Sequence, residues 1–144
     1  SRSVHLDGDA IGDVHPFDIY DNARIRHLYR TLALLVGFHR QNGYSNFVIN
    51  YVFESHTSLQ ELLDLPVPLD PAIHTYWLTS DPKEQARRIQ GRSREELDWE
   101  LRRFVELQRI QAKAAQQGFI GRQVDTTRLT PAEIADAIWK DIQG

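Results

Sequence analysis

The sequence predicts an α/β domain built on a parallel sheet with flanking helices, and two observations lead to that prediction. Four short stretches with strand character lie far apart in the chain, at 3–6, 46–53, 73–79 and 122–125. Segments with the apolar spacing of amphipathic helices separate them, which favours parallel strands joined by right-handed crossovers.

The first half of the chain is predicted to begin with a strand and a long helix. The strand 3–6 ends in an Asp-Gly-Asp turn at 7–9. A helix then begins after Asp21 or Asn22, either of which is a good N-cap, and ends at Gly43.

The next strand and helix lie in the middle of the chain. The stretch 46–53, NFVINYVF, lacks sustained alternation, so we expect a strand buried on both faces. A short helix over 58–65 is expected to end at the proline-rich segment LPVPLDP, and the strand 73–79 follows.

Three helix starts are visible in the second half. Ser80 or Asp81 caps a helix that ends near Gly91. Ser93 and Glu96 form a capping box for a helix that extends to about residue 117. After the strand near 122–125, the run Thr-Pro-Ala-Glu at 130–133 supplies a cap, a first-turn proline and a capping-box partner.

Composition limits the classes of function. The chain has 144 residues, which suits a single domain over 1–144, and its formal net charge of -3 supplies no positive field for nucleic acid or anionic membranes. Cysteine is absent, which excludes thiolate chemistry, and the six histidines show no paired metal-binding spacing. The longest apolar stretch, 32–38, is too short to span a bilayer, so we expect a cytoplasmic protein. Because the sequence begins with Ser1 and contains no methionine, we expect upstream sequence to belong to the natural protein.

The stretch DGDAIGDVHPFD at 7–18 holds the first candidate site residues. It has part of the ligand spacing of a calcium-binding loop, but Ile11 and Pro16 occupy unsuitable positions and a strand precedes it. Carboxylates at the end of a parallel strand, here Asp7 and Asp9, can instead take a proton from a hydroxyl or hold Mg²⁺ through water. A solvated turn is the plain alternative.

Four segments together carry a resemblance to a known superfamily. LDGD closes a strand, DNARIR opens a helix, SDPKEQARRIQGR follows a strand, and VDTTRLTPAEIADAI ends the chain. In this order they resemble the P-loop small-molecule kinases, such as adenylylsulfate, gluconate and shikimate kinases. The resemblance implies a P-loop NTPase-like three-layer architecture, a helical lid at about 88–103, ATP and Mg²⁺ as cofactors, and a small-molecule substrate.

The resemblance also implies roles for nine residues. Asp7 and Asp9 are implied as catalytic acceptor-site residues and as possible Mg²⁺ contacts through water. The implied substrate-binding residues are Asn22, Arg24 and Glu54, and the implied nucleotide-binding residues are Arg88, Arg92, Thr127 and Arg128. Plainer alternatives stay open: Arg24 could be an exposed surface residue, and Arg88 and Arg92 could form a solvated helix face.

The sequence departs from the superfamily in two places. The phosphate-binding pattern G-x-x-x-x-G-K-[ST] is absent, and Asn50 stands where many relatives place a magnesium-directing aspartate. In the superfamily, the strand that feeds the phosphate loop lies between the strands expected here at 46–53 and 73–79. We therefore expect the central strand to be missing from this sequence and to lie in an upstream unit of roughly 30 residues.

Two functional hypotheses follow. The first is an ATP-dependent phosphotransferase that acts on a hydroxyl of a small anionic metabolite. The alternative is a non-catalytic nucleotide-binding or interaction domain that has lost the phosphate loop.

Overall fold

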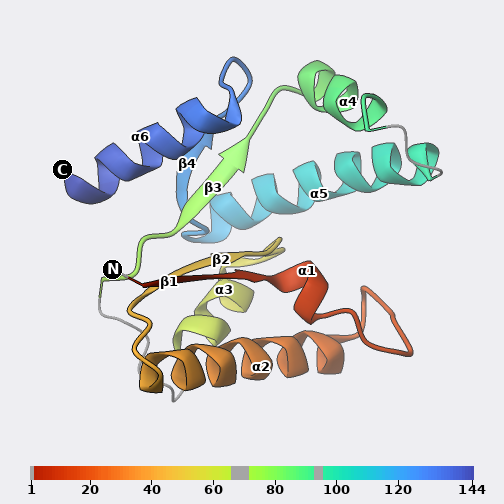
Figure 1. The fold of residues 1–144 in the computed structure, drawn as a ribbon. Helices are drawn as coiled ribbons and strands as arrows, with labels where there is room; N and C mark the ends of the chain where they lie inside the picture. Colours follow the sequence, from red (N-terminus) through yellow and green to blue (C-terminus); the bar gives the residue numbers. More distant parts are fainter. Residues whose placement is uncertain (1, 66–71, 93–95) are drawn as a thin grey trace. The chain divides into compact units, whose positions relative to one another are not determined.

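The computed structural model describes residues 2–65, 72–92 and 96–144. These residues form a mixed α/β structure (Figure 1). In chain order its elements are β1 (Ser3–Asp7), α1 (Gly8–Ile11), α2 (Asn22–Gln41), β2 (Asn46–Asn50), α3 (His56–Leu63), β3 (Tyr76–Thr79), α4 (Pro82–Gln90), α5 (Leu97–Gln117), β4 (Arg122–Asp125) and α6 (Pro131–Gln143).

The chain divides into two compact units. The N-terminal unit comprises Ser1–Phe53 and Thr57–Ile73, and the C-terminal unit comprises Glu54–His56 and His74–Gly144. Each unit contains one two-stranded parallel sheet among the described residues. The parallel strand pairing predicted from the alternation of strands and helices is therefore confirmed. A single domain over 1–144 stays a prediction.

In the N-terminal unit, β1 pairs with β2 in a register that runs from Ser3 opposite Asn46 to Asp7 opposite Asn50. Alternate side chains of the two strands face a core built with α2 and α3. The members of this core include Val4, Leu6, Phe47, Ile49, Leu28, Tyr29, Leu32, Val36 and Leu62. The other face of the sheet is open, since Val48 is 62% exposed. The expectation that 46–53 is buried on both faces is therefore wrong for this structure, and β2 ends at Asn50.

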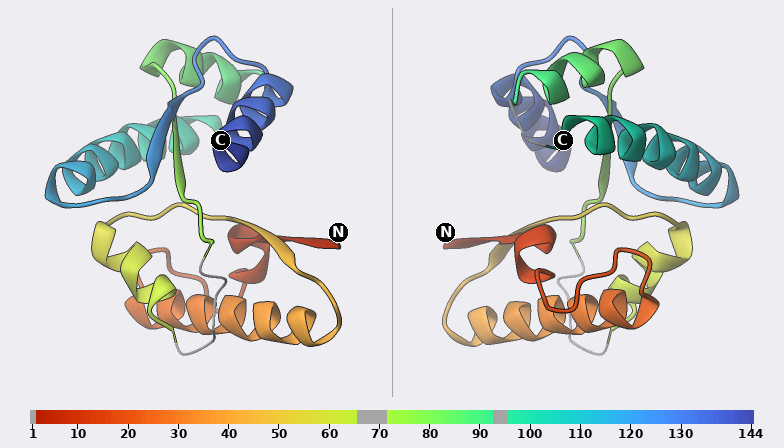
Figure 2. Two further views of the ribbon diagram at one scale, coloured as in Figure 1. Left: turned by 90° about the vertical axis from the view of Figure 1, so that its left-hand side faces the viewer. Right: turned by 90° about the vertical axis from the view of Figure 1, so that its right-hand side faces the viewer.

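The C-terminal unit has a helix on each face of its sheet (Figure 2). Strand β3 pairs with β4 from Tyr76 opposite Arg122 to Thr79 opposite Asp125. Neighbouring residues of a strand point to opposite faces. Accordingly, Trp77 donates to Gln111 of α5 at 3.1 Å, whereas Tyr76 donates to Asp141 of α6 at 2.6 Å. These two bonds connect β3 to α5 on one face of the sheet and to α6 on the other.

Side-chain caps begin three helices as the sequence predicts. Asp21 caps α2, Asp81 caps α4, and Thr130 forms a capping box with Glu133 at the start of α6. The capping box expected at Ser93 falls partly on residues 93–95, outside the described residues, and α5 begins at Leu97 with Glu96 at its N-cap.

No ladder joins β2 to β3 in the part of the chain that the structure describes. The missing central strand stays a prediction. Among the same residues, no helix combines the length and the apolar character needed to cross a bilayer.

Candidate functional site

An oriented carboxylate lies at the carboxyl end of β1. Asp7 is the last residue of the strand, and its Oδ1 accepts hydrogen bonds from the Asp9 backbone N–H at 3.0 Å and from Asn50 Nδ2 at 3.2 Å. Asp9 lies in the first turn of α1, is exposed, and its carboxylate has no hydrogen-bond partner among the described residues. The strand end thus presents one fixed and one free carboxylate two residues apart.

The Asp-Gly-Asp turn expected from the sequence is a one-turn helix, because the Asp7 side chain caps it. The glycine in the middle has a packing role. A Cβ atom on Gly8 would lie 2.5 Å from Cδ2 of Tyr51, closer than two carbon atoms can approach. Gly8 therefore lets the Tyr51 ring pack against the acidic turn.

Arg24 is buried beside this turn. It is 9% exposed, its Nε donates to the Asp18 carbonyl at 2.9 Å, and its guanidinium lies over the Phe17 ring at 4.6 Å from the centroid. Its Nη1 lies 3.4 Å from the position that a Cβ on Gly12 would take, just after α1. The alternative that Arg24 is an exposed surface residue is therefore wrong.

The charge of Arg24 is not balanced within the described structure. None of its nitrogens forms an ion pair there, and its two terminal nitrogens have no hydrogen-bond partner among the described residues. These two nitrogens are not among the fully buried unsatisfied atoms of the described residues, so a ligand can reach them. Such a side chain is suited to bind an anion. Asn22 opens the same helix and is exposed.

Glu54 lies in the C-terminal unit, whereas Asp7 and Asp9 lie in the N-terminal unit. Its carboxylate forms an ion pair with Arg103 of α5, which also pairs with Glu106 at 3.2 Å. In this arrangement Glu54 ties the segment 54–56 to α5.

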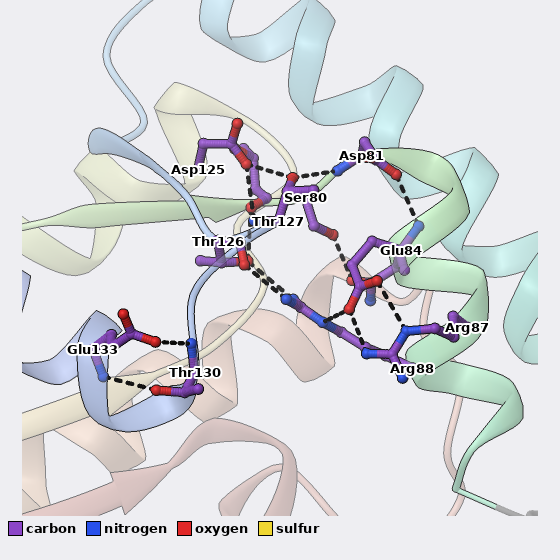
Figure 3. A network of polar contacts seen from close by, with 12 residues as sticks. Ser80, Asp81, Glu84, Arg87, Arg88, Asp125, Thr126, Thr127, Thr130 and Glu133 are labelled. Atoms are coloured by element: carbon purple, nitrogen blue, oxygen red, sulfur yellow. Dashed lines mark hydrogen bonds and ion pairs between the residues drawn. The ribbon is translucent and has the colours of Figure 1, made fainter.

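Arg88 joins α4 to the ends of the C-terminal strands (Figure 3). Its guanidinium donates to Glu84 at 3.1 Å, to the Thr126 hydroxyl at 3.0 Å and to the Thr126 carbonyl at 2.7 Å. Thr126 is buried, and its hydroxyl donates to the Thr79 carbonyl at 2.8 Å. The structure thus places Arg88 directly beside the loop that carries Thr127 and Arg128.

That loop borders an open hollow of about 510 Å³, lined by Asp81, Asp125, Thr127, Arg128 and Leu129. The Thr127 hydroxyl donates to Asp125 at 2.6 Å and accepts from the Asp81 N–H at 2.9 Å. Hydrogen bonds from the Thr127 hydroxyl and N–H lower the pKa of Asp125 below its usual value. Two implied nucleotide-binding residues therefore line one hollow.

The other lid residues are placed only in part. Arg92 follows α4, is exposed, and its side chain has no partner among the described residues. The segment 88–103 includes 93–95, which lie outside the described residues.

The described residues include no cluster of three or more histidine, aspartate or glutamate side chains that could hold a metal ion. One or two carboxylates do suit Mg²⁺ that is carried mainly by water and nucleotide phosphates. Asp7 and Asp9 fit that limited role.

Sequence reasoning missed how His5 and Asn50 are placed. His5 Nε2 lies 2.5 Å from Asn50 Oδ1, and Asn50 in turn contacts Asp7. His5 and Asp7 are two residues apart on one strand, so they share a face, but only the strand register reveals Asn50 beside them.

A signal for Arg24 was present in the sequence. It precedes Leu28 by four residues and Leu32 by eight, so it continues the buried stripe of α2.

Compared with models of known protein families and with curated proteins, the chain matches none.

Proposed function

We propose that the chain belongs to an ATP-dependent phosphotransferase that acts on a hydroxyl of a small anionic metabolite. The observation that carries this proposal is Arg24, a residue that is only 9% exposed and whose guanidinium has no ion-pair partner among the described residues. A carboxylate, sulfate or phosphate group on the acceptor would supply the missing negative charge and form charge-assisted hydrogen bonds. The acidic turn next to it offers the groups that the reaction needs.

The two carboxylates of the turn have different roles. Hydrogen bonds hold Asp7, so it orients the acceptor hydroxyl, and the free carboxylate of Asp9 takes the hydroxyl proton. Mg²⁺, when bound with the nucleotide, neutralises charge on the phosphates. Phosphoryl transfer depends mainly on positioning and electrostatics, which suits a site of few groups.

The nucleotide base is assigned to the hollow beside Thr127 and Arg128. Arg88 supports the proposal indirectly, because its bonds to Glu84 and Thr126 fix the loop against α4. Arg92, exposed just after α4, is the arginine that remains available for phosphates.

A non-catalytic nucleotide-binding or interaction domain is the second candidate. It is favoured by the sequence, which contains no G-x-x-x-x-G-K-[ST] pattern and whose three lysines follow no glycine-rich turn. The coding sequence upstream of Ser1 separates the two candidates: a glycine-rich turn that ends in Gly-Lys-Ser or Gly-Lys-Thr supports the kinase.

The test of the kinase proposal is phosphoryl transfer from labelled ATP to a panel of hydroxy acids and phosphorylated or sulfated alcohols, with the natural protein. Arg24→Gln is expected to raise the acceptor KM by roughly 10–100-fold, because a hydrogen bond to a charged group contributes about 1.5–3 kcal/mol. The KM for ATP should not change.

Arg26→Gln is the matched control, since Arg26 lies on the same helix and is exposed. It should leave both KM values as they are. An unchanged acceptor KM in Arg24→Gln would remove the anion-binding role, and ATP binding without transfer to any acceptor would favour the non-catalytic domain.

A further inference from the structure

The exposed face of the N-terminal sheet carries a directed chain of hydrogen bonds that ends at Asp7. His5 Nε2 contacts Asn50 Oδ1 at 2.5 Å, Asn50 Nδ2 contacts Asp7 Oδ1 at 3.2 Å, and the Asp9 N–H contacts the same oxygen at 3.0 Å. The three side chains share a face. His5 and Asp7 are two residues apart on β1, so their side chains point to the same side of the sheet, and Asp7 lies opposite Asn50.

The direction of each bond follows from the chemistry of the carboxylate. An ionised Asp7 can only accept, so Asn50 must present its amide nitrogen to it. The opposite orientation would bring the Asn50 oxygen against a carboxylate oxygen at 3.2 Å, which is repulsive. The Asn50 oxygen therefore faces His5, and His5 Nε2 must carry a proton in order to donate.

We infer that His5 and Asn50 are positioning residues that hold the Asp7 carboxylate in one orientation for the acceptor hydroxyl; the acceptor's part in this inference rests on the proposed function. Two N–H groups occupy Oδ1, so Asp7 presents only Oδ2 to a substrate. A single free oxygen accepts one hydrogen bond in a defined direction, as a hydroxyl needs before it loses its proton to Asp9.

The chain of hydrogen bonds also explains why asparagine can stand at position 50, where the resemblance to the P-loop kinases would lead one to expect an aspartate. A second carboxylate there would repel Asp7 at 3.2 Å unless a cation lay between them. Asn50 neutralises this position and donates instead, so the orientation of Asp7 does not depend on a bound ion. His5 fixes the amide from the other side and prevents it from rotating.

The first test is nuclear magnetic resonance of the His5 ring nitrogens, which needs no catalytic activity. We expect a single tautomer with the proton on Nε2 in the neutral ring. Asp7→Asn should convert it to a mixture, because the amide of Asn50 can then adopt either orientation. Asp9→Asn is the matched control and should leave the tautomer unchanged, since the Asp9 carboxylate takes no part in the chain of hydrogen bonds.

A tautomer mixture in the unmodified protein, or a tautomer that Asp7→Asn does not alter, would overturn the inference. The Asn50 amide gives a second readout. Its two side-chain proton signals should broaden in His5→Ala and sharpen again in His5→Gln, whose amide restores the donor.

The kinetic test separates a positioning role from a structural one. His5→Ala is expected to lower kcat by about 10-fold without change in the ATP KM. His5→Gln should retain most of the activity. Asn46→Ala, on the same face of β2, is the control and should leave kcat unchanged. Equal kcat in His5→Ala and the unmodified protein would overturn the role in transfer. If the protein transfers no phosphoryl group while His5 keeps one tautomer, the proposed function fails and the orientation of Asp7 by His5 and Asn50 is supported.

Discussion

At the scale of single residues, the acidic turn depends on one glycine. Gly8→Ala places a Cβ within 2.5–2.9 Å of the Tyr51 side chain, so either the ring or the turn must move. We expect the free energy of unfolding to fall by about 1–3 kcal/mol, the usual cost of overpacking, as measured by urea denaturation.

Gly91→Ala is the matched control for that change. Gly91 has φ -68° and ψ -13°, which any residue adopts, and the nearest atom to an added Cβ is 3.4 Å away. Alanine there should leave stability unchanged or raise it by about 0.4–1 kcal/mol. Equal effects at both positions would show that the contact between Gly8 and Tyr51 does not limit the turn.

The residues of the site were predictable to different degrees. Asp7 and Asp9 could be placed because a strand pattern ends directly before them. The burial of Arg24 follows from helical spacing, but its lack of an ion-pair partner requires the packed structure. His5 could not be assigned, because its contact with Asn50 joins residues that are 45 positions apart.

At the scale of secondary structure elements, Glu84 pairs with two arginines of its own helix, α4, and its titration should change the stability of the fold. Hydrogen bonding and ion pairing with Arg87, and to a lesser degree with Arg88, lower the pKa of Glu84 from 4.5 to about 2. A pKa lowered in the folded state means that the carboxylate stabilises the fold above pH 4.5 and that this contribution disappears as the pH falls toward 2.

We therefore expect the difference in urea midpoint between the unmodified protein and Glu84→Gln to be constant near neutral pH. It should shrink steadily below about pH 4.5. A difference that stays constant down to about pH 3 would contradict the assignment.

Apart from the one-turn helix α1, which was expected as a turn, element types were read correctly because their signals are local. Caps at Asp21, Asp81 and Thr130 follow from side chains that bond backbone N–H groups two or three residues away. The burial of β2 was not readable, because it depends on what covers each face of the sheet. Apolar composition at 46–53 cannot distinguish a covered face from an open one.

At the scale of the whole molecule, each sheet has only two strands among the described residues, and both strand pairs leave apolar side chains exposed. Val48 of β2 is 62% exposed and Leu78 of β3 is 52% exposed. Two-stranded sheets are marginal without further strands or helices. The resemblance to the P-loop kinases leads us to expect a further, central strand beside β3, and this strand stays a prediction.

The edge of β3 offers a test of that central strand. Arg122 N–H donates to the Thr75 carbonyl and Thr126 N–H to the Thr79 carbonyl. Because backbone groups of a strand alternate between its two edges, Trp77 and Thr79 point their N–H groups toward β4, and Leu78 points its N–H to the other edge. No described strand pairs with that edge.

Amide hydrogen exchange followed by nuclear magnetic resonance should therefore show fast exchange at Leu78 and protection at Trp77 in this 144-residue chain. In a longer protein that carries a strand, phosphate loop and helix before Ser1, the Leu78 amide should become protected by about 100-fold, because the new strand would accept its hydrogen bond. The exchange rate of the Gln123 amide of β4 serves as the internal reference when the two proteins are compared. Equal protection of Leu78 and Trp77 in the short chain would mean that the edge is already paired, and a β3 edge closed in that way leaves no place for the strand that a phosphate loop requires.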